Sequence, residues 1–372
     1  MSHAPNRLAL AAARVVMQDG YAAVEHAAED RATLAEWVDW DQTLALRSRL
    51  DGAGLGIAEA MDTAQRYEIG WDLARALIER TGALNLRTGF VAGAGIDHAE
   101  IHDLEGLAQA WAEQCRLIAD QGGVPVLLCL PELLALAPDE DAFVAAYDAV
   151  LARCDTPVLI HWLGPMFHPG LAGYFPGDSF ERVMALDRQQ VRGCKLSLLD
   201  ADLERRVRSA LAPRGQAVLT GDDHHFADLI VGESEEVLGE FELLGRTWPL
   251  GAFSHALLGV FEGLHTPLPS ILADLAQGRR EEARAALTRC EAFGQVVFEA
   301  PTRAYKAGLA FRAWASGEQT NPLLPFHAER QRDARHLERV LDTAAAARAL
   351  GPPEALEQAR AALGLRPGDG RG

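Results

Sequence analysis

The sequence predicts a closed barrel of eight parallel strands alternating with helices, a (β/α)8 or TIM barrel, with a helical C-terminal extension. Eight short apolar runs recur along the chain, most of them followed by a segment whose apolar residues are spaced three and four apart. The runs are largely apolar, as expected of strands that helices bury on both faces. An open doubly wound sheet usually carries a Gly-rich phosphate turn after its first strand, and none follows residues 8–17.

The predicted elements follow one another at the spacing of a barrel. The strands are expected at residues 8–17, 55–60, 86–93, 125–130, 157–162, 191–196, 217–220 and 251–254. The intervening helices are expected at residues 39–50, 70–80, 104–119, 139–152, 179–187 and 203–212. From about residue 269 the chain is rich in Ala, Arg, Glu and Leu, which favours helix. We therefore expect a catalytic barrel over residues 1–268, a helical extension over 269–365 and a disordered tail over 366–372.

Composition excludes several classes of protein. The 372 residues include 35 basic and 53 acidic side chains, a net charge of −18. A field of that sign disfavours nucleic acid and anionic membranes as partners. The apolar runs all fall short of the roughly 20 residues that a membrane-spanning helix needs. The five cysteines are widely spaced, and no secretory pattern precedes them, so we expect buried, reduced thiols in a cytoplasmic protein.

Lys195 is the sharpest single indication of chemistry. It lies within a predicted barrel strand, and Lys306 is the only other lysine of the chain. Burial lowers the pKa of an amine toward its neutral, nucleophilic form. A neutral amine attacks a carbonyl carbon to form a Schiff base. The structural alternative is a lysine that extends to the end of the strand or pairs with an acid such as Asp222.

Other polar residues follow the predicted strands, where the active sites of such barrels lie. His161 is a candidate catalytic base. Asp222 and its neighbour Asp223 follow a glycine, so at least one of them is expected to cap the next helix. Trp162 is either a packing residue or a sugar platform. The expected substrate-binding residues are Asp62, Thr63, Glu132, Trp162, Asp222, His224 and His255.

Four segments resemble the dihydrodipicolinate synthase and N-acetylneuraminate lyase superfamily of class I aldolases, and more narrowly its DUF993 branch. Residues 193–197, Gly-Cys-Lys-Leu-Ser, resemble the superfamily's Gly-Ile-Lys-Glu, which implies that Lys195 is the Schiff-base lysine. Residues 220–223 resemble its Ser-Gly-Asp-Asp turn, residues 157–164 align with its Pro-Val-Ile-Leu-Tyr-Asn-Val-Pro, and residues 278–284 resemble its C-terminal helical region. The likeness spans about residues 38–317. It implies the same barrel, assembled as a homodimer or homotetramer.

The departures from the superfamily bear on the substrate. Where it has Gly-Thr-Thr-Gly-Glu to hold a pyruvate carboxylate, residues 61–65 are Met-Asp-Thr-Ala-Gln. Asp62 would repel a bound carboxylate by roughly several kcal/mol in a partly buried site. His161 replaces a tyrosine proton shuttle, and the loop 164–170 lacks the arginine that binds the second substrate's carboxylate. These departures argue against authentic dihydrodipicolinate synthesis and favour a small carbonyl compound such as a keto sugar or a 2-oxo acid.

Two other classes of function stay open. A metal-dependent sugar isomerase or lyase would draw its ligands from Glu59, Glu132, His161, His224 and His255. A barrel without catalysis would bind a small molecule or regulate a partner. For the class I lyase or aldolase that we favour, no cofactor and no metal are expected.

Overall fold

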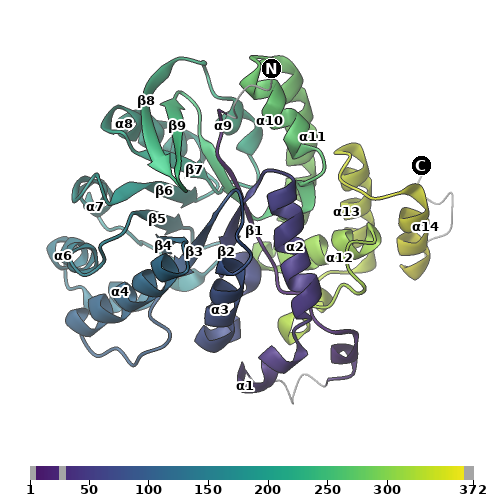
Figure 1. Cartoon of the computed structure of the whole chain (residues 1–372), viewed down its shortest axis with the longest axis horizontal. Coiled ribbons are helices and arrows are strands. Elements are labelled where there is room, and N and C mark those ends of the chain that lie inside the picture. Colours follow the sequence, from purple (N-terminus) through teal and green to yellow (C-terminus); the bar gives the residue numbers. More distant parts are fainter. Residues whose placement is uncertain (1–5, 25–30, 364–372) are drawn as a thin grey trace.

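A computed structural model, which describes residues 6–24 and 31–363, confirms the (β/α)8 barrel (Figure 1). Every neighbouring pair of barrel strands is parallel, and β1 closes the barrel by pairing with both β2 and β10. The barrel strands are β1 (Ala9–Ala12), β2 (Gly56–Glu59), β3 (Phe90–Ala94), β4 (Val124–Leu127), β5 (Val158–Leu163), β6 (Val191–Ser197), β7 (Ala217–Thr220) and β10 (His255–Leu258).

Helices surround this barrel. They are α1 (Arg31–Leu34), α2 (Trp40–Gly52), α3 (Arg66–Gly82), α4 (Leu104–Asp120), α5 (Pro131–Leu136), α6 (Glu140–Leu151), α7 (Ser179–Ala185), α8 (Ala201–Leu211), α9 (Phe226–Val231), α10 (Leu268–Ala276) and α11 (Arg280–Val297).

Aspartates cap several of these helices, because a carboxylate accepts a hydrogen bond from a free backbone N–H of the first turn. These caps are Asp39 on α2, Asp103 on α4, Asp139 on α6 and Asp200 on α8.

The barrel strands are apolar on both faces for two different reasons. Inward-facing residues such as Leu10, Leu159 and Leu257 fill the barrel interior. Outward-facing residues such as Ile57 and Ile160 pack in a second cluster beneath the helices. Because both faces are buried, the runs lack the polar alternation of a strand with one face in water.

The eighth strand differs from its predicted position. It begins at His255, four residues after the predicted start at residue 251. Residues 237–251 form an antiparallel hairpin of β8 (Val237–Leu243) and β9 (Arg246–Gly251), which the sequence analysis missed. Phe241 and Trp248 of this hairpin pack with barrel-interior residues, and both rings contact His255. The hairpin therefore plugs the N-terminal end of the barrel.

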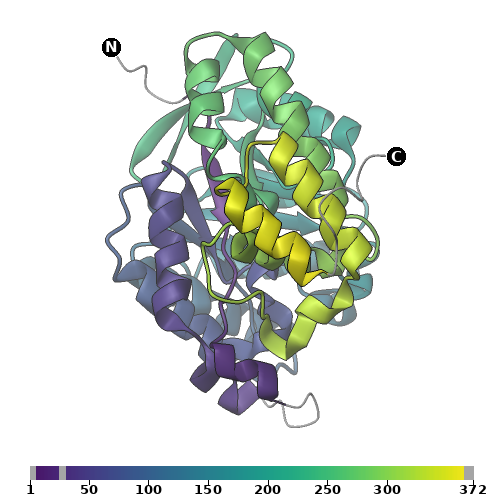
Figure 2. The ribbon, with the colours of Figure 1, turned by 90° about the vertical axis from the view of Figure 1, so that its right-hand side faces the viewer.

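The chain continues into α12 (Tyr305–Ala315), α13 (Ala334–Ala346) and α14 (Pro353–Ala362), which lie together on one side of the barrel (Figure 2). The helix α12 packs on the turn of residues 260–264 that follows β10, and α13 packs on α11. The expected tail over residues 366–372 lies outside the described residues.

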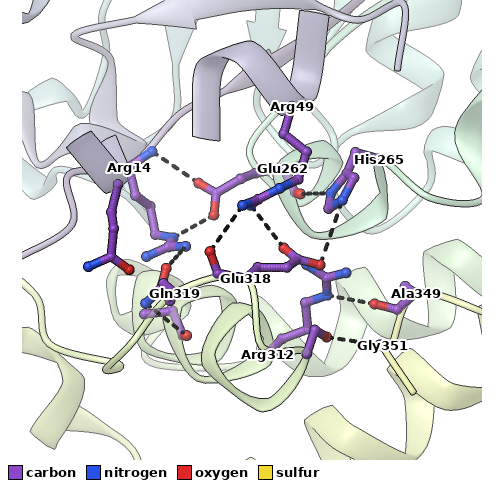
Figure 3. A network of polar contacts seen from close by, with 12 residues as sticks. Arg14, Arg49, Glu262, His265, Arg312, Glu318, Gln319, Ala349 and Gly351 are labelled. Carbon is purple, nitrogen blue, oxygen red and sulfur yellow. Dashed lines mark hydrogen bonds and ion pairs between the residues drawn. The ribbon is translucent and has the colours of Figure 1, made fainter. Parts of the chain in front are cut away.

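A network of buried and partly exposed polar contacts joins this extension to the barrel, including a buried hydrogen bond of 3.0 Å from Nη2 of Arg14 to Oε1 of Gln319 (Figure 3). Arg14, which follows β1, has its Nε 2.6 Å from Oε1 of Glu262. Glu318, which follows α12, pairs with Arg312 of α12 at 2.6 Å and with Arg49 of α2 at 3.3 Å. Removing one partner of a buried pair typically costs about 3–5 kcal/mol. The position of α12 relative to the barrel is therefore tightly specified.

The structure bears on two expectations drawn from composition, one about the cysteines and one about membrane-spanning helices. All five cysteines are free and buried, as predicted. Within residues 6–24 and 31–363, no helix combines the length and the apolar character needed to cross a membrane.

Candidate active site

Lys195 lies on β6 with its side chain inside the barrel. Its neighbours Cys194 and Leu196 face the outer layer, so the alternation of the strand turns Lys195 inward. A Cβ on Gly221, just beyond β7, would lie 2.8 Å from Cε of Lys195. The lysine side chain therefore leans toward the C-terminal mouth, and Gly221 leaves it room. The residue is 8% exposed.

Burial is the main electrostatic influence on this amine. Desolvation lowers the pKa of Lys195, against the opposing attraction of Asp223, Asp62 and Cys129. Within the described part of the chain, the amine of Lys195 has no hydrogen-bond or ion-pair partner. Asp223, Asp62 and Cys129 act on it only through their charges. A buried amine without a fixed partner is suited to act as a nucleophile.

Asp223 is the acid that faces Lys195, and the sequence analysis did not select it. It is 4% exposed, and its Oδ1 accepts a hydrogen bond of 3.0 Å from the backbone N–H of Val260. Burial raises the pKa of Asp223 to about 8, although the Val260 hydrogen bond and Lys195 act in the opposite direction. A carboxyl group in this environment holds a proton near neutrality and is able to donate it.

His161 lies on β5 directly across from Lys195 in the strand register. Its Nε2 shares a hydrogen bond of 3.3 Å with the Ser197 hydroxyl, and its Nδ1 is buried without a partner among the described residues. Burial and the neighbouring Lys195 lower the pKa of His161 well below its ordinary value. The imidazole is therefore neutral, with one nitrogen free to meet a ligand.

Asp62 and Thr63 follow β2 and contact the C-terminal extension. The Thr63 hydroxyl shares a hydrogen bond of 2.7 Å with that of Tyr305, at the start of α12. Oδ1 of Asp62 lies 3.1 Å from Nζ of Lys306, which is also on α12. Asp62 thus contacts Lys306 directly, and its charge also acts on Lys195. Neither Tyr305 nor Lys306 was predicted as a site residue from the sequence. The only sequence signal was that Lys306 is one of just two lysines in the chain.

Asp222 serves the backbone rather than the barrel mouth. Its Oδ1 accepts hydrogen bonds from the backbone N–H groups of His224 and His225, and its Oδ2 binds the His225 ring at 2.8 Å. These bonds order the turn before α9, whose N-cap residue is His225 with no side-chain cap hydrogen bond, so the expected capping of the next helix by one acid of the pair is wrong. The predicted substrate contact of Asp222 finds no support in this geometry.

His224 lies at the edge of the candidate site. Burial lowers the pKa of its ring, which lies close to the backbone of Phe298. Its Nε2 is buried and has no partner among the described residues.

Two predicted substrate-binding residues lie elsewhere. Trp162 occupies the outer face of β5, where its ring contacts Phe175 at 5.2 Å and Phe180 at 4.6 Å. His255 begins β10 instead of following it, so it lies in the lowest layer of the barrel. Its Nδ1 accepts from Leu8 N–H at 2.9 Å and its Nε2 donates to the Pro249 carbonyl at 3.0 Å. Both placements correct the prediction, and the late start of the eighth strand explains His255.

A cavity of about 390 Å³ opens over the ends of β3 and β4. Glu132 lines it, as do Tyr67 and His168. Tyr67 also experiences the charges of Asp62 and Glu132, so the cavity adjoins the residues that face Lys195. Glu132 thus lines a cavity that shares Tyr67 with the surroundings of Asp62.

The residues named for a metal site do not come together. Glu59 is fully buried behind the barrel wall, where Arg47 binds both of its oxygens at 2.8 Å. His255 lies at the opposite end from His161. Across the described parts of the chain, no group of three or more His, Cys, Asp or Glu side chains is arranged to hold a metal ion. The geometry therefore gives no support to the metal-dependent alternative.

Comparisons with known proteins agree with the fold. The family model described as "Protein of unknown function (DUF993)" matches residues 1–366. None of the curated proteins matches the sequence.

Solved structures with the same fold include two dihydrodipicolinate synthases. The one from Bacteroides thetaiotaomicron is 14% identical with a TM-score of 0.64, covering 92% of this chain and 99% of that one. The one from Agrobacterium tumefaciens is 17% identical with a TM-score of 0.62, covering 92% and 98%. CdNal from Clostridium difficile, solved in complex with mannosamine, is 12% identical with a TM-score of 0.54, covering 91% and 97%. At these identities the likeness concerns the fold alone.

Proposed function

Because this chain belongs to the DUF993 family and carries a buried amine at the mouth of a (β/α)8 barrel, we propose that it is a class I lyase or aldolase. Lys195 would form a Schiff base with a small carbonyl substrate. The observation that carries the proposal is a buried lysine, unpaired within the described chain, that leans toward the barrel mouth beside a buried acid. Active sites of such barrels lie at this end.

The first step is addition of the amine to the carbonyl carbon. The neutral nitrogen of Lys195 attacks that carbon, and the proton that the nitrogen then loses passes to the carbonyl oxygen to give a neutral carbinolamine. Asp223 supports the next step, because its raised pKa of about 8 lets it donate a proton to the departing hydroxyl group. Water leaves and the protonated imine remains. The Asp223 carboxylate and Asp62 then offset the new positive charge.

The second step breaks or makes a bond beside the imine carbon, which accepts the electron pair. His161 lies on the strand next to Lys195 and is neutral, so its unpartnered nitrogen is able to take a proton from the substrate. Its lowered pKa makes it a weaker base than an exposed histidine. The Ser197 hydroxyl, 3.3 Å from Nε2, orients the ring.

The surroundings of Asp62 revise our expectation about the substrate. We expected Asp62 to repel a bound carboxylate, but the ion pair with Lys306 offsets the charge of Asp62. The reason for preferring an uncharged keto sugar to a 2-oxo acid is therefore weaker. The loop 164–170 still lacks an arginine for a second carboxylate, so authentic dihydrodipicolinate synthesis stays outside the proposal.

Reductive trapping tests this function. The protein is incubated with 2-oxo acids and keto sugars, borohydride is added, and peptide mass spectrometry locates the adduct. We expect one compound to label Lys195 in the native protein and not after denaturation. Labelling of neither lysine by any carbonyl compound would contradict the Schiff-base function and favour a binding role for the barrel.

A further inference from the structure

We propose that Lys306, from the C-terminal extension, is a positioning residue of the active site that fixes the Asp62 side chain by a direct ion pair and offsets its charge at Lys195. The inference rests on the proposed function, and it assigns the extension a part in the chemistry of the barrel. Its starting point is that the two lysines of the 372-residue chain, 111 positions apart, both interact with one aspartate.

The contact between Lys306 and Asp62 is well shielded from water. The Lys306 side chain is 4% exposed and the Asp62 side chain 20%, with Nζ 3.1 Å from Oδ1. A buried ammonium is retained where a nearby carboxylate and further polar contacts offset its desolvation. The Nζ atom also lies 4.9 Å from the centre of the Tyr305 ring, a favourable cation–π distance. Lys306 therefore has one definite placement.

The backbone that carries Lys306 is itself held in place. Tyr305, the residue before it, bonds Thr63 at 2.7 Å and stacks on Phe298 with ring centres 4.1 Å apart. Farther along α12, Arg312 pairs with Glu318. A long, flexible side chain gains little from a surface ion pair. Here the helix that carries Lys306 is already fixed by other contacts, so forming the Lys306–Asp62 pair costs less conformational entropy than a surface pair does.

The charges around Lys195 make the Lys306–Asp62 pair consequential. An uncompensated Asp62 would favour the ammonium form of Lys195, which is not nucleophilic. Lys306 offsets this attraction in the resting protein. When the imine forms and becomes positive, Asp62 is already in place to stabilise it. The groups whose charges act on Lys195 or respond to it are Asp62 after β2, Cys129 after β4, His161 on β5 and Asp223 after β7. Those that interact with Asp62 from other elements are Tyr305 and Lys306 on α12, Tyr67 on α3 and Asp223 after β7.

The presence of only two lysines makes a direct test practical. In protein labelled with 15N-lysine, NMR resolves two Nζ signals, which the Lys195→Met variant assigns. Titration of the Lys195 signal in Lys306→Met is expected to show at least about a threefold smaller fraction of neutral amine at a given pH near its midpoint than in the wild type. Lys306→Arg keeps the charge and should stay within about twofold of the wild type.

A double-variant comparison keeps the test decisive. Asp62→Asn should increase the neutral fraction of Lys195, whereas Asp62→Asn with Lys306→Met should return it to within about twofold of the wild type. If the single variant Lys306→Met does not fold, the neutral fraction of Lys195 in Asp62→Asn is compared with that in the double variant. The difference between these two values is the effect of Lys306. An unchanged or larger neutral fraction on removal of Lys306 would overturn the inference.

The NMR titration needs no substrate, so it separates the two proposals. Failure of carbonyl trapping at Lys195 in the wild type would reject the lyase function. Insensitivity of the Lys195 titration to Lys306 would reject the positioning role while leaving the lyase function intact. Where both hold, the pH profile of imine formation in Lys306→Met should move to higher pH, and that of Lys306→Arg should not.

Discussion

The two ends of the barrel each bury a histidine beside a basic residue, but they use them differently. At the N-terminal end both ring nitrogens of His255 are hydrogen-bonded, and Arg7 donates to the Ile230 and Val231 carbonyls and to Glu235. At the C-terminal end one nitrogen of His161 has no partner among the described residues, and Lys195 has only Coulombic neighbours.

This difference indicates that His255 is buried for stability, whereas His161 is buried with a nitrogen free for a ligand. Desolvation lowers the pKa of His255 to about 3 and lowers that of His161 as well, so perturbed titration alone does not distinguish the two ends. Hydrogen bonding does distinguish these two rings, since both nitrogens of His255 are bonded and Nδ1 of His161 is not. Variants matched between the two ends test that distinction.

The largest expected effect is on the nucleophile. Lys195→Ala should lower the rate of the reaction on the true substrate at least about a thousandfold, because the Schiff base no longer forms. Turnover and borohydride trapping measure this loss. The matched change at the other end, Arg7→Met, should lower the melting temperature and leave trapping per folded molecule unchanged. Unaltered turnover in Lys195→Ala would refute the role of the lysine.

A change beside the nucleophile should come next in size. In Gly221→Ala the new Cβ would lie 2.2 Å from Oγ of Ser197 and 2.8 Å from Cε of Lys195. Displacing the amine by a fraction of an ångström should slow trapping by about a hundredfold. Gly56→Ala at the N-terminal end meets only the Leu10 side chain and should reduce stability without slowing trapping. Equal trapping rates in both variants would contradict the placement of Lys195.

The two histidines should give opposite results. His161→Leu should lower turnover about a hundredfold with a smaller loss of stability than His255→Leu, because its Nδ1 has no partner to lose and its Nε2 loses only the 3.3 Å bond with Ser197. His255→Leu should lower the free energy of unfolding by about 1–3 kcal/mol, since Leu8 N–H loses its acceptor, with turnover unchanged. Urea denaturation and steady-state kinetics of both variants are the measurements. A stability loss in His161→Leu as large as that in His255→Leu would remove the contrast.

The last prediction concerns the pH dependence of stability and does not involve the reaction. Asp223 has a folded-state pKa of about 8 against an ordinary 3.8, so between about pH 4 and pH 8 the folded protein holds a proton that the unfolded chain has released. Its contribution to stability therefore falls as pH rises through this window.

Asp223→Asn removes that contribution. The free energy of unfolding of the variant relative to the wild type should rise from pH 5 to pH 8 in denaturant titrations. Glu204, whose burial raises its pKa to about 7, has the same sign and is present in both proteins, so it cancels in the difference. A difference that does not change with pH would show that Asp223 is already ionised at pH 5.

The sequence predicted the barrel and the seven strands before residue 237 to within a few residues at most ends. It missed the hairpin, although Phe241 and Leu243 alternate with glutamates and Gly245 marks the turn, because the eighth strand was assigned to residues 251–254. That displacement moved His255 from the bottom layer to the presumed mouth. Trp162 was misplaced for a related reason, since an aromatic residue at a strand end gives no sign of which face it occupies.

The sequence by itself determined the fold class and singled out Lys195 and His161, because strand and helix periodicity are local and lysine is rare in this chain. Only the tertiary structure decided which groups meet them. Asp62 and Lys306 are 244 residues apart, and no local pattern connects residues that far apart. Whether Asp222 or Asp223 faces the amine also depends on the turn after β7, where one carboxylate is occupied by backbone N–H groups and the other is buried against Lys195.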